Sequence, residues 1–229
     1  MLEICGKPLR ARANAKYDQA GLHKCYREAG HDGNCSEFPY LEHLKEVAPR
    51  VAAKIARDST KTTGASWKSE DAGPNRISRW TMLLSDEELA KLGVNMGALK
   101  PLVVAKLRDK AATYEDCMSA AQYLTWSAYG MRGAPAPDLY TEKYLVSCFG
   151  PIPAGTTGCL VCRATLDFKL FDAARRGKAE IETAHAMPRS HTAGNVGFAH
   201  RDCNIAQGDK SLDEFYGWIA GILQRAGRA

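Results

Sequence analysis

The sequence predicts an α+β protein in which a mainly helical N-terminal part precedes a small C-terminal module closed by a pair of zinc knuckles. Apolar residues recur at helical spacing up to about residue 129, and short alternating stretches typical of strands follow only later. Two Cys/His pairs enclose those stretches, Cys159/Cys162 and His200/Cys203. We therefore expect a helical region over residues 1–130, a linker over 131–157 and a second domain over 158–229.

Composition sets broad limits on the class of protein. The 31 Lys and Arg residues against 26 Asp and Glu residues give a net charge of +5, which is compatible with a nucleic-acid partner without identifying one. The N-terminus lacks a signal-like apolar segment, and no run of about 18 apolar residues occurs, so we expect a cytoplasmic protein without membrane spans. In a reducing compartment the eight cysteines favour metal ligation over disulfides.

Residues 1–35 are polar and are expected to be loop-like. They contain Cys5, Cys25, His31 and Cys35 at irregular spacing. A segment too polar to form its own core can be stabilised by zinc. We interpret these residues as separate thiols and a histidine, and a second zinc site remains the open alternative.

Helices are expected from about residue 37 to 57, from 86, over 97–111 and over 114–129. Leu44, Val51 and Ile55 share one face of the first, where Pro49 predicts a kink or two abutting helices. A basic stripe on another face is interpreted as solvated, with phosphate contact as the alternative: Arg50, Lys54, Arg57 and Lys61. Ser85 and Glu88 form a capping box, and Gly93 is expected to end that helix.

The linker is predicted from its composition. "MRGAPAPD" at 131–138 and "GPIPAGTTG" at 150–158 are rich in Pro and Gly. Beyond it we expect strands over 164–170, 180–185 and 195–199, and a helical region from His200. The final helix, opened by Ser211 and Glu214 as a second capping box, is predicted to pack the C-terminal module onto the helical part.

The two Cys/His pairs predict a structural zinc ion. Cys159 and Cys162 have the spacing of a zinc knuckle, and His200 and Cys203 repeat it. Three thiolates and one imidazole complete a tetrahedral site and leave no open position for a substrate or water. A redox function for "CLVC" would leave His200 and Cys203 unexplained and lacks the expected strand–helix context.

Three further residues carry a resemblance to a known family. His185 in "HAMPRS", Asn195 and Asn204 in "NVGFAHRDCN", and the "GDK" at 208–210 lie between or just after the zinc pairs. Together they resemble the HNH endonucleases of the ββα-metal nuclease superfamily. The resemblance covers about residues 158–217.

The resemblance implies a function and a set of roles. It implies a metal-dependent endonuclease that hydrolyses DNA phosphodiester bonds, with residues 1–130 binding double-stranded DNA. His185 would be the general base that activates water, and Asn195 would hold the loop and orient His185 through backbone hydrogen bonds. Asn204 would ligate a catalytic Mg²⁺ or Mn²⁺, and Arg189 would clamp a phosphate. Whether the chain forms a homodimer is left open.

The chain departs from the family pattern beside the general base. Ala184 stands where an acidic or histidine ligand of the catalytic metal is common. Glu182, two residues earlier on the strand, is a candidate substitute ligand, and so is His191 in the following loop. The alternative is therefore a zinc-stabilised DNA-binding or adaptor module that has lost catalysis. A zinc deaminase is not supported, because the required Glu and Pro-Cys-x-x-Cys are absent.

Overall fold

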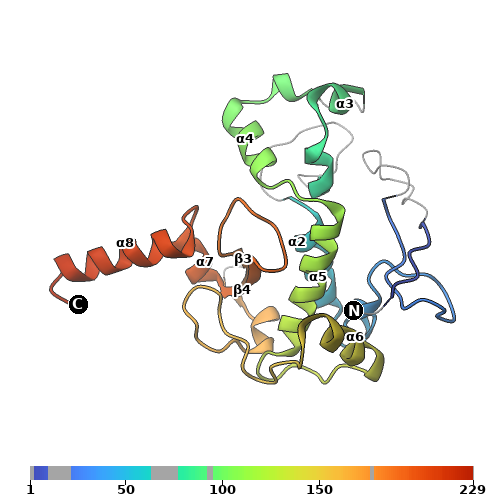
Figure 1. Ribbon diagram of the computed structural model, residues 1–229. Helices are drawn as coiled ribbons and strands as arrows, with labels where there is room; N and C mark the ends of the chain where they lie inside the picture. The colour runs from blue at the N-terminus through green and yellow to red at the C-terminus, as the bar shows by residue number, and fades with distance from the viewer. Residues whose placement is uncertain (1–2, 10–21, 63–76, 92–94, 176–177, 229) are drawn as a thin grey trace.

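The computed structural model describes residues 3–9, 22–62, 77–91, 95–175 and 178–228 and has an α+β architecture (Figure 1). The α-helices are α1 Glu42–Val47, α2 Pro49–Thr60, α3 Asp86–Lys91, α4 Pro101–Asp109, α5 Tyr114–Tyr129, α6 Leu139–Phe149, α7 Arg201–Gln207 and α8 Leu212–Arg225. Short 3-10 helices are η1 Pro39–Leu41, η2 Arg79–Leu83, η3 Met96–Ala98 and η4 Phe168–Phe171.

Among the described residues, the named strands form two small antiparallel pairs. One pairs β1 (Ala174–Arg175) with β2 (Lys178–Ala179), and the other pairs β3 (Ile181–His185) with β4 (Val196–His200). The register of β3 and β4 sets Ile181 opposite His200 and His185 opposite Val196. Helix α7 starts directly after β4, so the expected strand–strand–helix unit is present.

The helix boundaries follow local signals in the sequence. Pro49 opens α2 at its first position, and Ala48 leaves the helical conformation, so two abutting helices form instead of one kinked helix. The side chains of Thr113 and Asp138 cap α5 and α6. The capping box expected at Ser211 opens α8. The Ser85 box also forms, whereas Gly93 lies outside the described residues.

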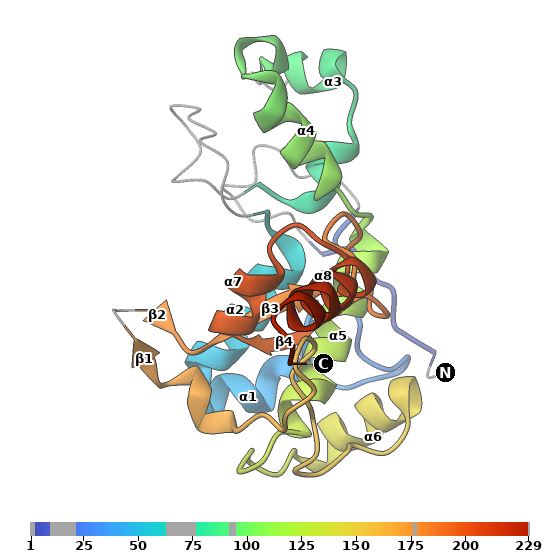
Figure 2. The same cartoon turned by 90° about the vertical axis from the view of Figure 1, so that its left-hand side faces the viewer.

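One hydrophobic core joins the two parts of the chain that were expected to be separate domains. Helix α5 packs against α2 on one side and against β4 on the other. Leu124 of α5, Ile55 of α2 and Phe198 of β4 belong to the same buried cluster and are at most 1% exposed. A smaller second cluster holds together the α3–α4 lobe, seen at the top of Figures 1 and 2: Ile77, Met82, Leu84, Leu89, Met96 and Leu107.

The expectation of a linker over 131–157 is wrong for much of that stretch. It contains α6, in which Tyr144 and Leu145 are buried in the main core. Tyr144 also stacks on Tyr40, with ring centroids 5.5 Å apart. The Pro- and Gly-rich sequences on either side of α6 form its flanking loops, and Met131 at the start is itself buried.

Two other expectations need correction. The strand predicted over 164–170 ends in the 3-10 helix η4, because the Asp167 side chain accepts a hydrogen bond from the Lys169 backbone N–H and turns the chain. Helix α8 packs through its N-terminal half, with Leu212 and Phe215 buried and Ile219 partly buried against the main core. It then projects away from the body, and Trp218 is 49% exposed (Figures 1 and 2).

Within the described part of the chain, no helix combines the length and apolar character needed to cross a lipid bilayer.

The shared core makes a testable prediction for unfolding. Phe198 lies 5.1 Å from Phe171, ring centroid to ring centroid, and is 1% exposed. We expect Phe198→Ala to lower the free energy of unfolding by about 3–5 kcal/mol, in a single transition that includes the helical part. Urea denaturation followed by circular dichroism measures this. The control is Val47→Ala, at a half-exposed position of α1, which should change it by less than about 0.5 kcal/mol. Separate transitions for helices and hairpin would contradict a common core.

Candidate functional site

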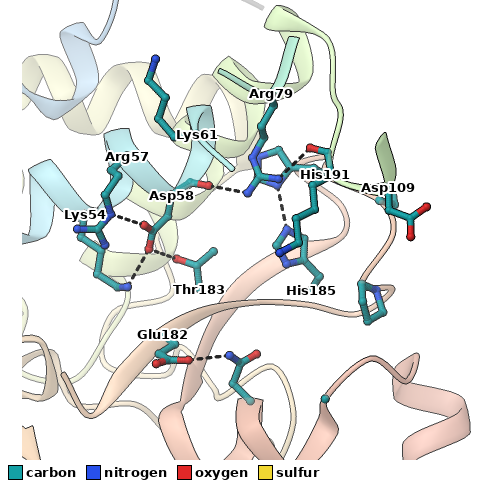
Figure 3. Close-up of a pocket in the computed structure, with 15 residues that line it drawn as sticks. Lys54, Arg57, Asp58, Lys61, Arg79, Asp109, Glu182, Thr183, His185 and His191 are labelled. Carbon is teal, nitrogen blue, oxygen red and sulfur yellow. Dashed lines mark hydrogen bonds and ion pairs between the residues drawn. The ribbon is translucent and has the colours of Figure 1, made fainter. Parts of the chain in front are cut away.

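A cavity of about 390 Å³ lies where the end of α2 faces the β3–β4 hairpin and α7 (Figure 3). It is polar, and its lining comes from both parts of the chain. The lining residues are Lys54, Arg57, Asp58, Lys61, Arg79, Asp109, Lys110, Glu182, Thr183, His185, Pro188, Ser190, His191, Asn204 and Gly208.

The helical part gives this cavity its positive charge. Five of the lining residues are Lys or Arg, and three are Asp or Glu. Lys54, Arg57 and Lys61 belong to the basic stripe that the sequence shows on α2 and just after it, whereas Arg50 of that stripe does not line the cavity. Three of the four residues of the stripe therefore line the cavity, which argues against interpreting the stripe as a solvated surface.

Asp58 connects this basic wall to the hairpin. Its carboxylate accepts hydrogen bonds from Lys54 Nζ at 2.8 Å and Arg57 Nε at 2.6 Å, and from Thr183 Oγ1 on β3 at 3.1 Å. Burial alone would raise the pKa of Asp58, but the charges and hydrogen bonds of Lys54 and Arg57 outweigh it and hold the pKa below its usual value. Asp58 is therefore ionised and links α2 to β3.

His185, the last residue of β3, is fixed by a chain of two hydrogen bonds. Its Nε2 lies 2.9 Å from Nδ1 of His191, and Nε2 of His191 lies 2.7 Å from the carbonyl oxygen of Ser59 in α2. A carbonyl oxygen only accepts, so the proton of His191 is on Nε2. Neutral His191 then accepts at Nδ1, His185 donates from Nε2, and Nδ1 of His185 keeps a free lone pair.

Both histidines are neutral at physiological pH. Burial lowers the pKa of His185 to about 4, and the positive charges of Arg79 and Lys110 act in the same direction. Burial and the charge of Arg79 lower the pKa of His191 to about 2. Since neither ring carries a second proton near pH 7, the hydrogen-bond chain has the single arrangement described above.

Arg79 is an important site residue that the sequence did not indicate. Its guanidinium donates to the carbonyl oxygens of Asp58 and Lys110, both at 3.1 Å, and the residue is 6% exposed. These carbonyls lie at the C-terminal ends of α2 and α4, where a positive charge is favourable. Arg79 follows a polar connection with no periodic pattern, and only the long-range fold brings it to the cavity.

Asn195 organises the loop that follows His185. Its Oδ1 accepts from the Met187 backbone N–H at 2.8 Å, and its Nδ2 donates to the carbonyls of Met187 and Ser190. From α7, Gln207 Nε2 donates to the His185 carbonyl at 2.8 Å. Asn195 therefore bonds the backbone of the loop beside His185, the contact expected of it.

Asn204 of α7 and Glu182 of β3 form a pair on the cavity wall. Asn204 Nδ2 donates to Glu182 Oε2 at 2.8 Å, and Arg201 donates to the other carboxylate oxygen. This hydrogen bond does not use the Asn204 amide oxygen. Ala184 lies between Glu182 and His185 in sequence and is buried in the core.

Two candidate residues are placed differently from expectation. The Arg189 side chain is 77% exposed, does not line the cavity and approaches Asp109 at 3.8 Å. His191 was a candidate metal ligand, but both of its ring nitrogens take part in the hydrogen-bond chain. His191 therefore contacts the His185 ring and offers no ring nitrogen to a metal ion.

Two groups of three cysteines and one histidine can each bind zinc. Cys159, Cys162, His200 and Cys203 bring their ligand atoms within 4.8 Å of one another. His200 Nδ1 lies 3.4 Å from Cys162 Sγ and 3.9 Å from Cys203 Sγ, close to the ~3.6 Å expected between S and N ligands of tetrahedral zinc.

The second group consists of Cys5, Cys25, His31 and Cys35. The interpretation of these residues as separate thiols is therefore wrong, since the fold gathers all four at one point.

Comparison with known proteins identifies the family. A model of the DraIII family, a family of type II restriction endonucleases, matches residues 37–203. The chain belongs to the DraIII family. A solved structure titled "Crystal structure of a type II restriction endonuclease" matches this DraIII-family chain with a TM-score of 0.85 and 42% sequence identity over 100% of both chains. Comparison with curated proteins gives no match.

Proposed function

We propose that this DraIII-family protein is a DNA endonuclease of the HNH type that uses a divalent cation to hydrolyse phosphodiester bonds. Family membership and the similarity to a solved type II restriction endonuclease support DNA cleavage. The observation that carries the HNH assignment is the His185 ring. It is held neutral, with Nδ1 unprotonated, at the edge of a cavity lined by five cationic side chains.

His185 is the general base in this proposal. Its Nδ1 accepts a proton from the attacking water, because its Nε2 is already committed to His191. His191 is a positioning residue, since its bond to the Ser59 carbonyl fixes which nitrogen of His185 is free. Asn195 does not contact the His185 ring through these bonds and acts by holding the loop that begins at Ala186.

The catalytic cation is assigned to Asn204, with Glu182 beside it. An amide oxygen and a carboxylate are hard donors of the kind that Mg²⁺ and Mn²⁺ prefer, and both residues line the cavity that contains His185. The hydrogen bond from Asn204 Nδ2 to Glu182 leaves the amide oxygen of Asn204 as the ligand. When bound, the cation stabilises negative charge on the leaving oxygen.

Double-stranded DNA is the proposed partner of the basic wall. Lys54, Arg57 and Lys61 of the helical part face the hairpin across the cavity and supply charge for the phosphates flanking the scissile bond. Arg189 is assigned to a phosphate outside the cavity, because its side chain is exposed. A homodimer is supported by exposed apolar residues on the projecting helix α8: Trp218, Ile222 and Leu223.

The Cys159 group is assigned a structural zinc ion. Its four ligands fill a tetrahedral site, so the zinc takes no part in the chemistry. Cys159 and Cys162 precede the hairpin, and His200 and Cys203 lie at the junction of β4 and α7. A zinc ion there fixes α7, and with it Asn204, against the strand that carries His185.

Nicking of supercoiled plasmid tests the proposal. With Mg²⁺ or Mn²⁺ the wild-type protein should nick or linearise the plasmid, and His185→Ala should lower the rate at least about 100-fold because the base is lost. The matched control is His43→Ala in α1. His43 donates to or accepts from Tyr129 OH at 2.8 Å and does not line the cavity, so cleavage should be retained. Tight duplex binding without cleavage by the wild type under either metal would instead favour the binding-module alternative.

The pH dependence of cleavage provides a second test. Because the pKa of His185 is lowered to about 4, the unprotonated base is already present well below neutral pH and is lost only as pH falls through about 4. We expect the single-turnover rate at saturating metal to change little between about pH 7.5 and pH 5.5. Circular dichroism at each pH checks folding. A half-maximal rate near the ordinary histidine pKa of about 6.5 would contradict a buried neutral base.

A further inference from the structure

The N-terminal segment contains a metal-ligand cluster outside the proposed nuclease site. Residues 3–9 and 22–29 run antiparallel, with bridges between Ile4 and Glu28 and between Pro8 and Lys24. Cys5 lies on the first arm and Cys25 on the second, and backbone hydrogen bonds join the arms on both sides of them. His31 and Cys35 come from the loop that follows.

The ligand atoms have the spacing of a tetrahedral zinc site. His31 Nε2 lies 3.4 Å from Cys25 Sγ and 3.8 Å from Cys35 Sγ, and all four ligand atoms lie within 4.8 Å of one another. Zinc–ligand bonds of about 2.3 Å for sulfur and 2.0–2.1 Å for nitrogen give S–N separations of ~3.6 Å. The two S–N distances at His31 bracket this value, as expected of ligands that share one ion.

The groups around the cluster orient these ligands for a cation. His31 Nδ1 lies 3.2 Å from the Asp32 carbonyl oxygen, which only accepts, so Nδ1 carries the proton and Nε2 presents its lone pair to the cysteines. The Ser36 backbone N–H donates to Cys25 Sγ at 3.4 Å, a contact that favours a thiolate. The Cys159 group has the same feature, with the Cys162 N–H donating to Cys159 Sγ at 3.5 Å.

Little hydrophobic burial is available to hold this segment in place. Among the described residues from 3 to 36, only Cys25 and Tyr26 are buried hydrophobic residues. A segment with so little core needs another source of stability, and zinc binding supplies one when the site forms only in the folded chain.

The segment also supports residues next to the candidate site. The His23 ring packs edge-on against Trp80 and Tyr114, and His23 and Tyr114 both bond the Glu37 carboxylate at 2.6 Å. Trp80 directly follows Arg79, which lines the cavity. Fixing the segment therefore also fixes the aromatic cluster that backs the basic wall.

We propose that Cys5, Cys25, His31 and Cys35 bind a second structural zinc ion, which secures the N-terminal segment against α5 and Trp80. The four ligands occupy every tetrahedral position, so the ion has no catalytic role. With the zinc assigned to the Cys159 group, each chain therefore binds two zinc ions, one in the N-terminal segment and one beside the β3–β4 hairpin.

Metal analysis of the purified full-length protein, dialysed against metal-free buffer, tests this assignment. Mass spectrometry of the metal content should give two zinc ions per chain. Cys35→Ser, at a half-buried ligand position, should give one, and Cys203→Ser should independently give one. The matched control is Cys148→Ser, a half-buried cysteine outside both clusters, which should retain two.

The outcomes separate clearly. A wild-type protein with one zinc ion or none overturns the proposal, and this result does not depend on whether any variant folds. Two ions in folded Cys35→Ser protein also overturn it, because the second ion would then lie elsewhere. Loss of one ion in Cys35→Ser, together with a lower melting temperature, supports it. None of these readouts requires nuclease activity.

Discussion

The hydrogen-bond chain from His185 through His191 to the Ser59 carbonyl joins the hairpin to the helical part at the point where the chemistry is proposed. Its direction is set at one end by a backbone carbonyl, which cannot donate. The proton positions on both histidines then follow because the rings are neutral, since a buried ring next to Arg79 does not hold a second proton. The free nitrogen of His185 is thus specified by a helix more than a hundred residues earlier in the sequence.

The two parts of the chain depend on each other because they share a core and a charged wall. The Asp58 carboxylate satisfies two cations of α2 and bonds Thr183 of β3, so the basic surface and the hairpin are aligned by one side chain. Arg79 adds a third connection by bonding the C-terminal carbonyls of two helices. The two metal-ligand clusters lie outside this contact, and the cluster at Cys5, Cys25, His31 and Cys35 belongs to a segment with little hydrophobic burial of its own.

Features with a local signal could be predicted from the sequence. Strand β3 ends at His185 as expected, and the capping box at Ser211 forms, because both depend on residues a few positions apart. The four ligands that include Cys159 could be predicted to share one metal ion because the residues of each pair are separated by the same two-residue gap. Cys5 and Cys25 are separated by 19 residues with no repeated spacing, so only the fold reveals that they meet. Arg79 and Asp58 likewise reach the cavity through long-range packing, and α6 was hidden by the prolines and glycines around it.

The most direct test of the account is the tautomer of His185, measured by nitrogen-15 NMR of histidine-labelled protein near pH 7. We expect a protonated Nε2 and an unprotonated Nδ1. His191→Gln should preserve this state, because a glutamine amide can accept from His185 and donate to Ser59, whereas His191→Leu should allow both tautomers. A protonated Nδ1 in the wild type, or a doubly protonated ring at pH 7, would contradict the proposed origin of the base.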